Sequence, residues 1–162
     1  MKRLIALSLL FLIFVSGCAH FGNKYTEKDV IEKCDFESYE SEEGSYKGVD
    51  CIVIEGVYPK ESSPYKVYYY IFNSEADAKE AFDSDVSNIG GHSEIEEQSE
   101  NEIRYWQIVP DVGIREYEYV SKNLLIKTTL NKASCWSDEY NEADWNMTPE
   151  IQDRIDLIKN EF

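Results

Sequence analysis

The chain has 162 residues, a formal net charge of −16, and an aromatic content of 14% that includes 12 tyrosines. So acidic a surface repels nucleic acid and anionic lipid headgroups, which excludes both as electrostatic partners. The aromatic content also argues against intrinsic disorder, although 30% of the residues are charged. We therefore expect one globular domain, large enough to bury a core.

The N-terminal segment carries the signals of an exported protein. Lys2 and Arg3 precede an apolar run over residues 4–15, the length of a secretory signal and short of the roughly 20 residues of a membrane-spanning helix. The run leads into a branched apolar residue, two small residues and a cysteine, Val15-Ser16-Gly17-Cys18. A secretory signal cut at another site is the alternative.

Val15-Ser16-Gly17-Cys18 resembles the lipobox of bacterial-type lipoprotein precursors. The resemblance implies cleavage before Cys18, with residues 1–17 as the signal peptide, and a diacylglyceryl thioether on the cysteine sulfur. Cleavage removes two basic residues, so 16 become 14 against 32 acidic residues. The acyl chains on Cys18, and not electrostatic attraction, would then hold the protein to the lipid bilayer on its extracytoplasmic side.

The mature chain is expected to start with a tether and a short helix. Residues 18–25 would be the lipidated cysteine and its tether, and residues 26–162 the extracytoplasmic domain. Thr26 is a good N-cap for a helix whose inner face would hold Val30 and Ile31. The polar residues 34–46 contain a predicted turn at Glu42-Glu43-Gly44, and the β-branched residues 49–58 predict a strand that Pro59 ends.

The middle of the chain predicts a strand, a helix and three more strands. The strand at residues 65–72 is apolar or aromatic on both faces, as expected where a sheet is covered on both sides. Asn73 or Ser74 caps a helix that Gly90-Gly91 stops, and residues 92–101 are expected to form an acidic loop. The three further strands are predicted at residues 103–109, 114–120 and 124–130, with a tight link at 121–123.

The last part of the chain predicts an irregular acidic segment and a final helix. Thr148-Pro149 opens this helix as N-cap and first residue, and an apolar stripe runs along it: Ile151, Ile155, Ile158 and Phe162. Hairpins separated by a helix predict an α+β fold: a single domain with an antiparallel sheet of about five strands and helices packed on one face.

The cysteines suggest one disulfide in an oxidising compartment. With Cys18 lipidated, three thiols remain. A hairpin centred on Glu42-Glu43 places Cys34 opposite Cys51, within reach of a disulfide. Cys135 would then be free or available for pairing with another chain. If the first helix instead runs through Cys34, this register fails and Cys135 becomes the better partner for either of the others.

Tyrosines on the predicted strands are the binding candidates, because aromatic groups with polar tips suit a ligand or partner surface. They are Tyr68 and Tyr70 on one strand, and Tyr117 and Tyr119 on another. The same residues also suit the half-buried face of a sheet. Arg104 and Arg115, among acids and aromatics, are either ion-pair partners or ligands of an anion.

An acidic cluster near the C-terminus is a weak candidate for a metal site. Its oxygen ligands would come from Asp138, Glu139, Glu142 and Asp144. The spacing does not match an EF-hand loop, and a solvated acidic loop is the favoured interpretation. With no Cys-x-x-Cys motif and only two histidines, we expect no resident metal and no cofactor.

These observations favour a membrane-tethered, non-enzymatic lipoprotein that binds a protein or small-molecule partner outside the cytoplasm. The first alternative is a small extracytoplasmic hydrolase using paired carboxylates. Facing carboxylates in a pocket would favour this enzyme, and a shallow aromatic sheet surface would favour binding. The second alternative is an acidic cation-binding protein.

Replacing the lipidated cysteine tests the processing signal. We expect Cys18→Ser to leave the protein unprocessed or to release it from the membrane, because the lipid is the only anchor that the sequence predicts. Membrane fractionation and mass spectrometry of the N-terminal peptide measure both outcomes. Tight membrane retention of a fully processed Cys18→Ser protein would contradict the lipoprotein interpretation.

Overall fold

The computed structural model describes residues 24–58, 65–91, 93–109, 112–134 and 149–162. Within these ranges the chain forms three helices and seven strands. In chain order they are α2 (Glu27–Lys33), β1 (Ser38–Tyr46), β2 (Val49–Tyr58), β3 (Tyr65–Phe72), α3 (Glu75–Asn88), β4 (Ser93–Gln98), β5 (Glu102–Val109), β6 (Val112–Ser121), β7 (Leu124–Ser134) and α4 (Pro149–Glu161). None of these helices is both long and apolar enough to cross a lipid bilayer.

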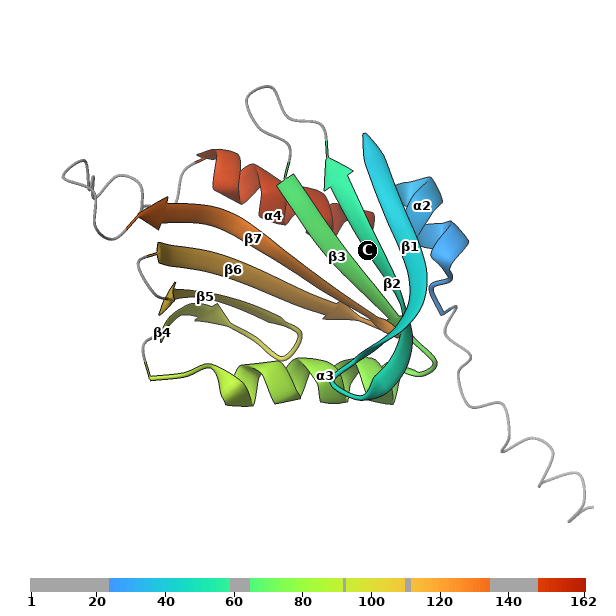
Figure 1. Ribbon diagram of the computed structural model, residues 1–162, viewed down its shortest axis with the longest axis horizontal. Coiled ribbons are helices and arrows are strands. Elements are labelled where there is room, and N and C mark those ends of the chain that lie inside the picture. The colour runs from blue at the N-terminus through green and yellow to red at the C-terminus, as the bar shows by residue number, and fades with distance from the viewer. Residues whose placement is uncertain (1–23, 59–64, 92, 110–111, 135–148) are drawn as a thin grey trace, which may run out of the picture.

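The seven strands form one antiparallel sheet in the order β1-β2-β3-β7-β6-β5-β4. Figure 1 shows α2 and α4 behind this sheet and α3 below it in the view. Strands β3 and β7 lie at its centre, where Tyr69 pairs with Ile126 and both side chains are fully buried. The predicted α+β class is therefore confirmed, with seven strands where about five were expected.

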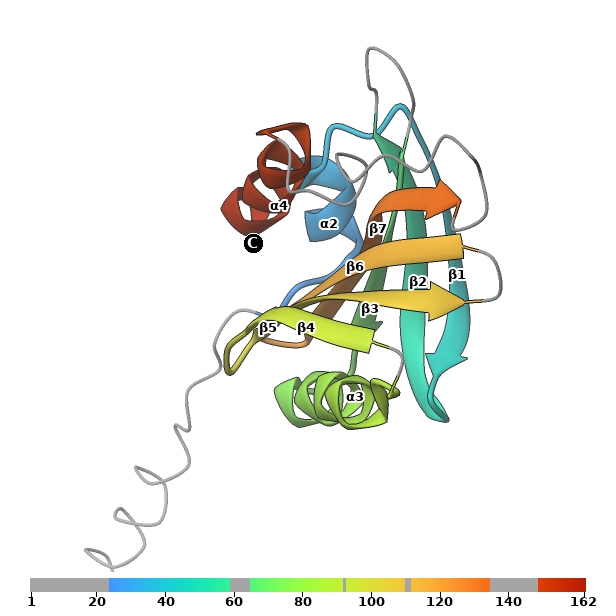
Figure 2. The ribbon, with the colours of Figure 1, turned by 90° about the vertical axis from the view of Figure 1, so that its left-hand side faces the viewer.

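The sheet has a hydrophobic core on each face, because successive side chains of a strand point to opposite sides. We call the first side the α2/α4 face; its core contains Val30 of α2 and Ile155 of α4 together with Tyr69 of β3. The second side is the α3 face, where Phe82 of α3 packs with Phe72 of β3. In Figure 2, α2 and α4 lie together on one side, and α3 lies apart from both.

The prediction that the helices pack on one face was therefore wrong. The sequence of β3, apolar on both sides, correctly indicated a doubly covered strand. Hydrophobic spacing shows which side of a helix is buried, and it does not show which face of the sheet receives that helix.

Both strands that the sequence analysis missed lie at the edges of the sheet. β1 was expected to be a polar turn and β4 an acidic loop. An edge strand has only one neighbour, and the residues of β4 after Ser93 are exposed, although the Glu96 side chain folds back onto two arginines. Neither strand therefore needs the alternating apolar residues by which a strand is recognised in a sequence. Charged side chains at an edge also discourage pairing with other chains.

The β1–β2 hairpin turns five residues later than predicted. Lys47 and Gly48 both have positive φ, 52° and 83°, and form the turn, so Gly44 lies opposite Cys51. Cys34 caps the end of α2 in the α2/α4 core, and Cys51 belongs to the α3 core. Both thiols are free and buried, so the Cys34–Cys51 disulfide was wrong. Cys135 lies outside the described residues.

Asn123 holds the start of the described chain against the sheet. It sits in the predicted tight turn between β6 and β7 and is 2% exposed. Its side chain accepts a hydrogen bond from the Tyr25 amide (2.7 Å) and donates to the carbonyls of Tyr25 (3.0 Å) and Phe72 (2.9 Å). The Tyr25 hydroxyl in turn donates to the Phe162 carbonyl (3.0 Å), so both ends of the described chain meet here.

The α2 helix begins as the sequence predicts. Thr26 is its N-cap and forms a capping box with Asp29, and the Asp29 carboxylate accepts from both the amide and the hydroxyl of Thr26. The hydrogen bonds from Thr26 lower the pKa of Asp29. The predicted N-cap Ser74 likewise starts α3.

Gly56 of β2 makes room for an aromatic ring. A Cβ at this position would overlap the ring of Phe36, which packs edge-on against Tyr58 (centroids 5.1 Å apart) and Tyr69 (5.6 Å). Because the rings of Tyr58 and Tyr69 pack against it, the Phe36 ring has little freedom to shift away from an added methyl group.

We expect Gly56→Ala to lower the free energy of unfolding by about 1–3 kcal/mol, because it overpacks this aromatic cluster. Urea unfolding measures the change. Gly90→Ala is the control, because an added Cβ there meets nothing within 4 Å. Equal effects of the two substitutions would show that the Phe36 contact does not constrain the strand.

Candidate functional site

The four tyrosines proposed as binding residues lie on opposite faces of the sheet. Tyr117 and Tyr119 belong to the α2/α4 face, where Tyr117 is fully buried. Tyr68 and Tyr70 point to the α3 face, and both are half-buried. Tyr119 is half-buried as well, so only in the second pair are both rings partly exposed, and the four residues do not form one surface.

Tyr46 of β1 extends this pair into a row of three tyrosines. The ring centroids of Tyr46 and Tyr70 are 4.3 Å apart, and those of Tyr70 and Tyr68 are 6.4 Å apart and stacked. We call Tyr46, Tyr70 and Tyr68 the tyrosine row. Helix α3 packs mainly on β3, β6 and β7, and beside the row Val53 and Val57 of β2 are half-buried.

Lys127 of β7 connects the tyrosine row to the helix below it. Its ammonium group donates to the Tyr46 hydroxyl (2.7 Å) and the Asp85 carboxylate (2.9 Å), and forms an ion pair with Glu118 (3.0 Å). Tyr46 also donates to Asp85 (2.6 Å), and Lys47 forms a second ion pair with this carboxylate. One lysine therefore joins β1, α3, β6 and β7, directly across from Tyr68 in the neighbouring strand β3.

Two carboxylates meet at the hydroxyl of Tyr105 next to this lysine. The hydroxyl lies 2.6 Å from Glu116 and 3.2 Å from Glu118. Since it has one proton, it donates to one carboxylate at a time, and the shorter distance favours Glu116. Glu118 is fully buried, and its second oxygen has no hydrogen-bond partner among the described residues.

The two acidic groups that contact Lys127, Glu118 and Asp85, bind a proton with different affinities. Burial raises the pKa of Glu118 to about 7, although Lys127 opposes the shift. Burial alone would also raise the pKa of Asp85, but hydrogen bonds from Lys127, Lys47 and Tyr46 outweigh it and hold this pKa below its usual value. Glu118 therefore exchanges its proton near neutral pH while Asp85 stays ionised.

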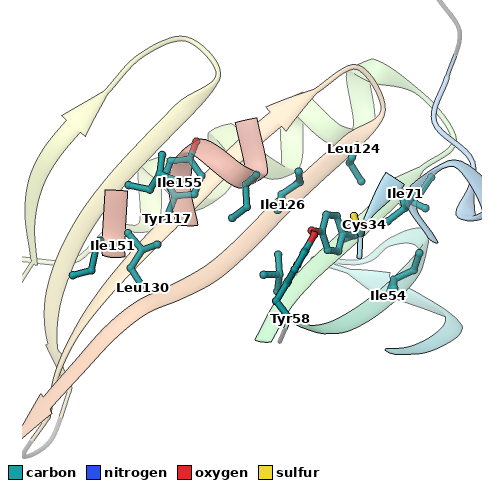
Figure 3. Close-up of a cluster of buried hydrophobic side chains, with 14 residues drawn as sticks. Cys34, Ile54, Tyr58, Ile71, Tyr117, Leu124, Ile126, Leu130, Ile151 and Ile155 are labelled. Atoms are coloured by element: carbon teal, nitrogen blue, oxygen red, sulfur yellow. The ribbon is translucent and has the colours of Figure 1, made fainter. Parts of the chain in front are cut away.

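A second polar cluster lies within the α2/α4 core. The Tyr58 hydroxyl is 2.6 Å from both the Tyr69 hydroxyl and the Glu161 carboxylate, and the Cys34 thiol lies 3.4 Å from the same carboxylate. Figure 3 shows the Tyr58 ring beside Cys34. Burial raises the pKa of the Cys34 thiol to about 12, so it stays protonated and does not act as a nucleophile.

The two arginines found by sequence both form ion pairs. Arg115 is 3% exposed and holds the Glu96 carboxylate (2.8 Å), which Arg104 also contacts (3.2 Å). Arg104 further pairs with Glu97 (3.0 Å). These contacts attach the edge strand β4 to β5 and β6.

The four acidic metal candidates, Asp138, Glu139, Glu142 and Asp144, lie outside the described residues. Within the part of the chain that the structure describes, no group of three or more His, Cys, Asp or Glu side chains is arranged to hold a metal ion.

The α3 face thus offers aromatic contact area and a proton-exchanging carboxyl group, the second of which the sequence analysis missed. None of Asp85, Glu118 and Lys127 was singled out from the sequence. The available signal was the position of Asp85 in the helix, three residues after the buried Phe82 and next to the partly buried Val86.

We expect Glu118→Gln to remove part of the pH dependence of stability. The folded-state pKa of Glu118 lies above its ordinary value, so the folded state holds this proton more tightly and loses stability as the pH rises from about 4.5 to about 7. When the pH rises from about 5 to about 8, the free energy of unfolding of the wild type should fall by about 1–3 kcal/mol more than that of Glu118→Gln.

Urea unfolding at the two pH values measures this difference, with the exposed Glu94→Gln on β4 as control. A wild-type protein and a Glu118→Gln variant with parallel pH profiles would show that Glu118 is ionised in the fold throughout.

Comparison with known proteins gives no relative for this chain. No family model matches it, and neither a curated protein nor a solved structure does. Its function is therefore inferred from its own residues.

Proposed function

We propose that this protein is a lipid-anchored domain on the extracytoplasmic side of a membrane, and that it binds a partner without catalysing a reaction. The anchor is the diacylglyceryl group on Cys18, which the lipobox Val15-Ser16-Gly17-Cys18 supports. The partner is a protein or a small molecule, since the net charge of the chain disfavours nucleic acid.

The hydrogen bonds around Asn123 support an anchored domain. Asn123 and Phe162 fix Tyr25 to one end of the sheet, seven positions after Cys18 in the sequence. A tether this short keeps the domain within a few tens of ångströms of the bilayer, because an extended chain spans at most about 3.5 Å per residue.

The observation that carries the binding proposal is the half-buried tyrosine row beside α3. Tyrosine supplies a large, rigid contact area and a polar tip at a low cost in conformational entropy. Tyr46 is held in place by Lys127 and Asp85, and its ring packs in a tilted arrangement against Tyr70, so this part of the surface is ordered before a partner arrives. Preorganisation of this kind increases affinity.

Binding is favoured over catalysis by the burial of the acidic groups. A catalytic carboxyl group must come within hydrogen-bond reach of its substrate. Glu118, whose pKa is raised by burial, is 0% exposed and lies under α3. Its neighbour Lys127 already takes up one of its oxygens.

A hydrolase is the second candidate, and one observation favours it. Glu116 and Glu118 both lie within hydrogen-bond distance of the Tyr105 hydroxyl, and only Glu116 is partly exposed. Two carboxyl groups that share a hydroxyl, one buried and one partly exposed, can divide the roles of acid and base. Under this alternative, Glu116→Gln would abolish a hydrolytic activity that Tyr68→Ala leaves intact.

Site-specific crosslinking tests the binding proposal. A photoreactive phenylalanine analogue at position 68 of the full-length protein should give one discrete adduct in intact cells. The same analogue at position 157 should give none, because Leu157 is exposed at 39% on the opposite, α4, side. Once the adduct identifies the partner, Tyr68→Ala should weaken binding about tenfold or more, as loss of a central aromatic contact does.

The exposed Tyr39 of β1 provides the matched control, since Tyr39→Ala removes the same side chain outside the row. An adduct that forms only at position 157, or equal losses from Tyr68→Ala and Tyr39→Ala, would contradict binding through the tyrosine row.

A further inference from the structure

A pocket of about 800 Å³ lies where the described chain enters the domain, away from the tyrosine row. Its walls come from the segment leading into α2, the β1–β2 hairpin and the end of β3. This volume falls within the range of small-molecule sites in proteins.

The walls of this pocket are fixed by hydrogen bonds. Asn123 accepts from the Tyr25 amide and donates to the Tyr25 carbonyl. The Lys24 ammonium donates to the Asn73 carbonyl (2.6 Å), and the capping box of Thr26 and Asp29 sets the first turn of α2. The entering segment therefore holds its shape without a ligand.

The lining combines apolar side chains with unpaired carboxylates. Ile52 and Ile71, partly and largely buried members of the α2/α4 core, supply apolar surface. Glu27, Glu43 and Asp50 supply negative charge, and none of them forms an ion pair with another described residue.

The hairpin register brings two of these carboxylates together. Glu43 lies opposite Ile52, and Asp50 comes two residues before Ile52 on the same strand. Glu43 and Asp50 therefore share one face of the sheet as diagonal neighbours, about 7–8 Å apart. Glu27 stands in the first turn of α2 above that face.

We propose that this pocket binds a small organic cation, specifically a free aliphatic diamine or polyamine. Its ammonium groups would face Glu43 and Asp50, and its hydrocarbon chain would lie over Ile52 and Ile71. A phospholipid headgroup fits less well, because its phosphate would be repelled by the three carboxylates. Among the described residues of the lining, Lys24 alone is basic, and its ammonium group already donates to a carbonyl group.

Calorimetric titration of the full-length, lipidated protein in detergent tests this proposal, with cadaverine as the probe at about 0.15 M salt, where diffuse charge is screened. We expect saturable binding at one site. Asp50→Asn and Glu43→Gln should each weaken it severalfold, and the double variant about tenfold or more. Both residues are exposed, so amide replacements of the same shape should preserve the fold.

Two controls make the result decisive. Glu94→Gln removes the same charge from the far edge strand β4 and should leave the affinity unchanged. Ethanolamine-lipid micelles should not compete with cadaverine for the site.

The proposal is overturned if cadaverine shows no saturable binding, if Glu94→Gln weakens binding as much as Asp50→Asn, or if the lipid micelles compete. It does not rest on the proposed function, because these variants leave the tyrosine row and Cys18 untouched.

Discussion

The α3 face depends on Lys127, a lysine of β7 that contacts groups from three other elements. Its ammonium group contacts Tyr46 of β1, Asp85 of α3 and Glu118 of β6 from its own strand β7. Burial alone would lower its pKa, but Glu118 and Asp85 raise it, so the charge is retained. Removing one member of such a cluster leaves its partners buried and unpaired, which typically costs about 3–5 kcal/mol.

The contacts of Lys127 make the α3 face different from the α2/α4 face. The α2/α4 face is closed by two helices, and its polar groups, such as Tyr58 and Glu161, bind one another inside the core. On the α3 face one helix covers part of the sheet, and the charged cluster at its boundary holds the tyrosine row in position. The proposed amine pocket lies at the entry of the chain, where Asn123 fixes the backbone.

The sequence predicted the elements of the interior better than those of the edges. Strand β3 and the helix caps Thr26 and Ser74 were identified because burial and capping impose local patterns. β1 and β4 were missed because an exposed edge imposes none. The predicted hairpin register was wrong because the chain turns at Lys47-Gly48 and not at Glu42-Glu43-Gly44, a choice that depends on how β1 pairs with β2. The Lys127 cluster joins residues from positions 46 to 127, and no local pattern encodes a contact over that distance.

Hydrogen–deuterium exchange of a Lys127→Met variant tests the central role of this lysine most directly. The account predicts faster exchange, by about tenfold or more, at Tyr46 in β1 and around Asp85 in α3, with the edge strand β4 unchanged, because the contacts of Lys127 lie in β1, α3 and β6. Unchanged exchange at Tyr46 and Asp85, or equally faster exchange throughout the sheet, would contradict it.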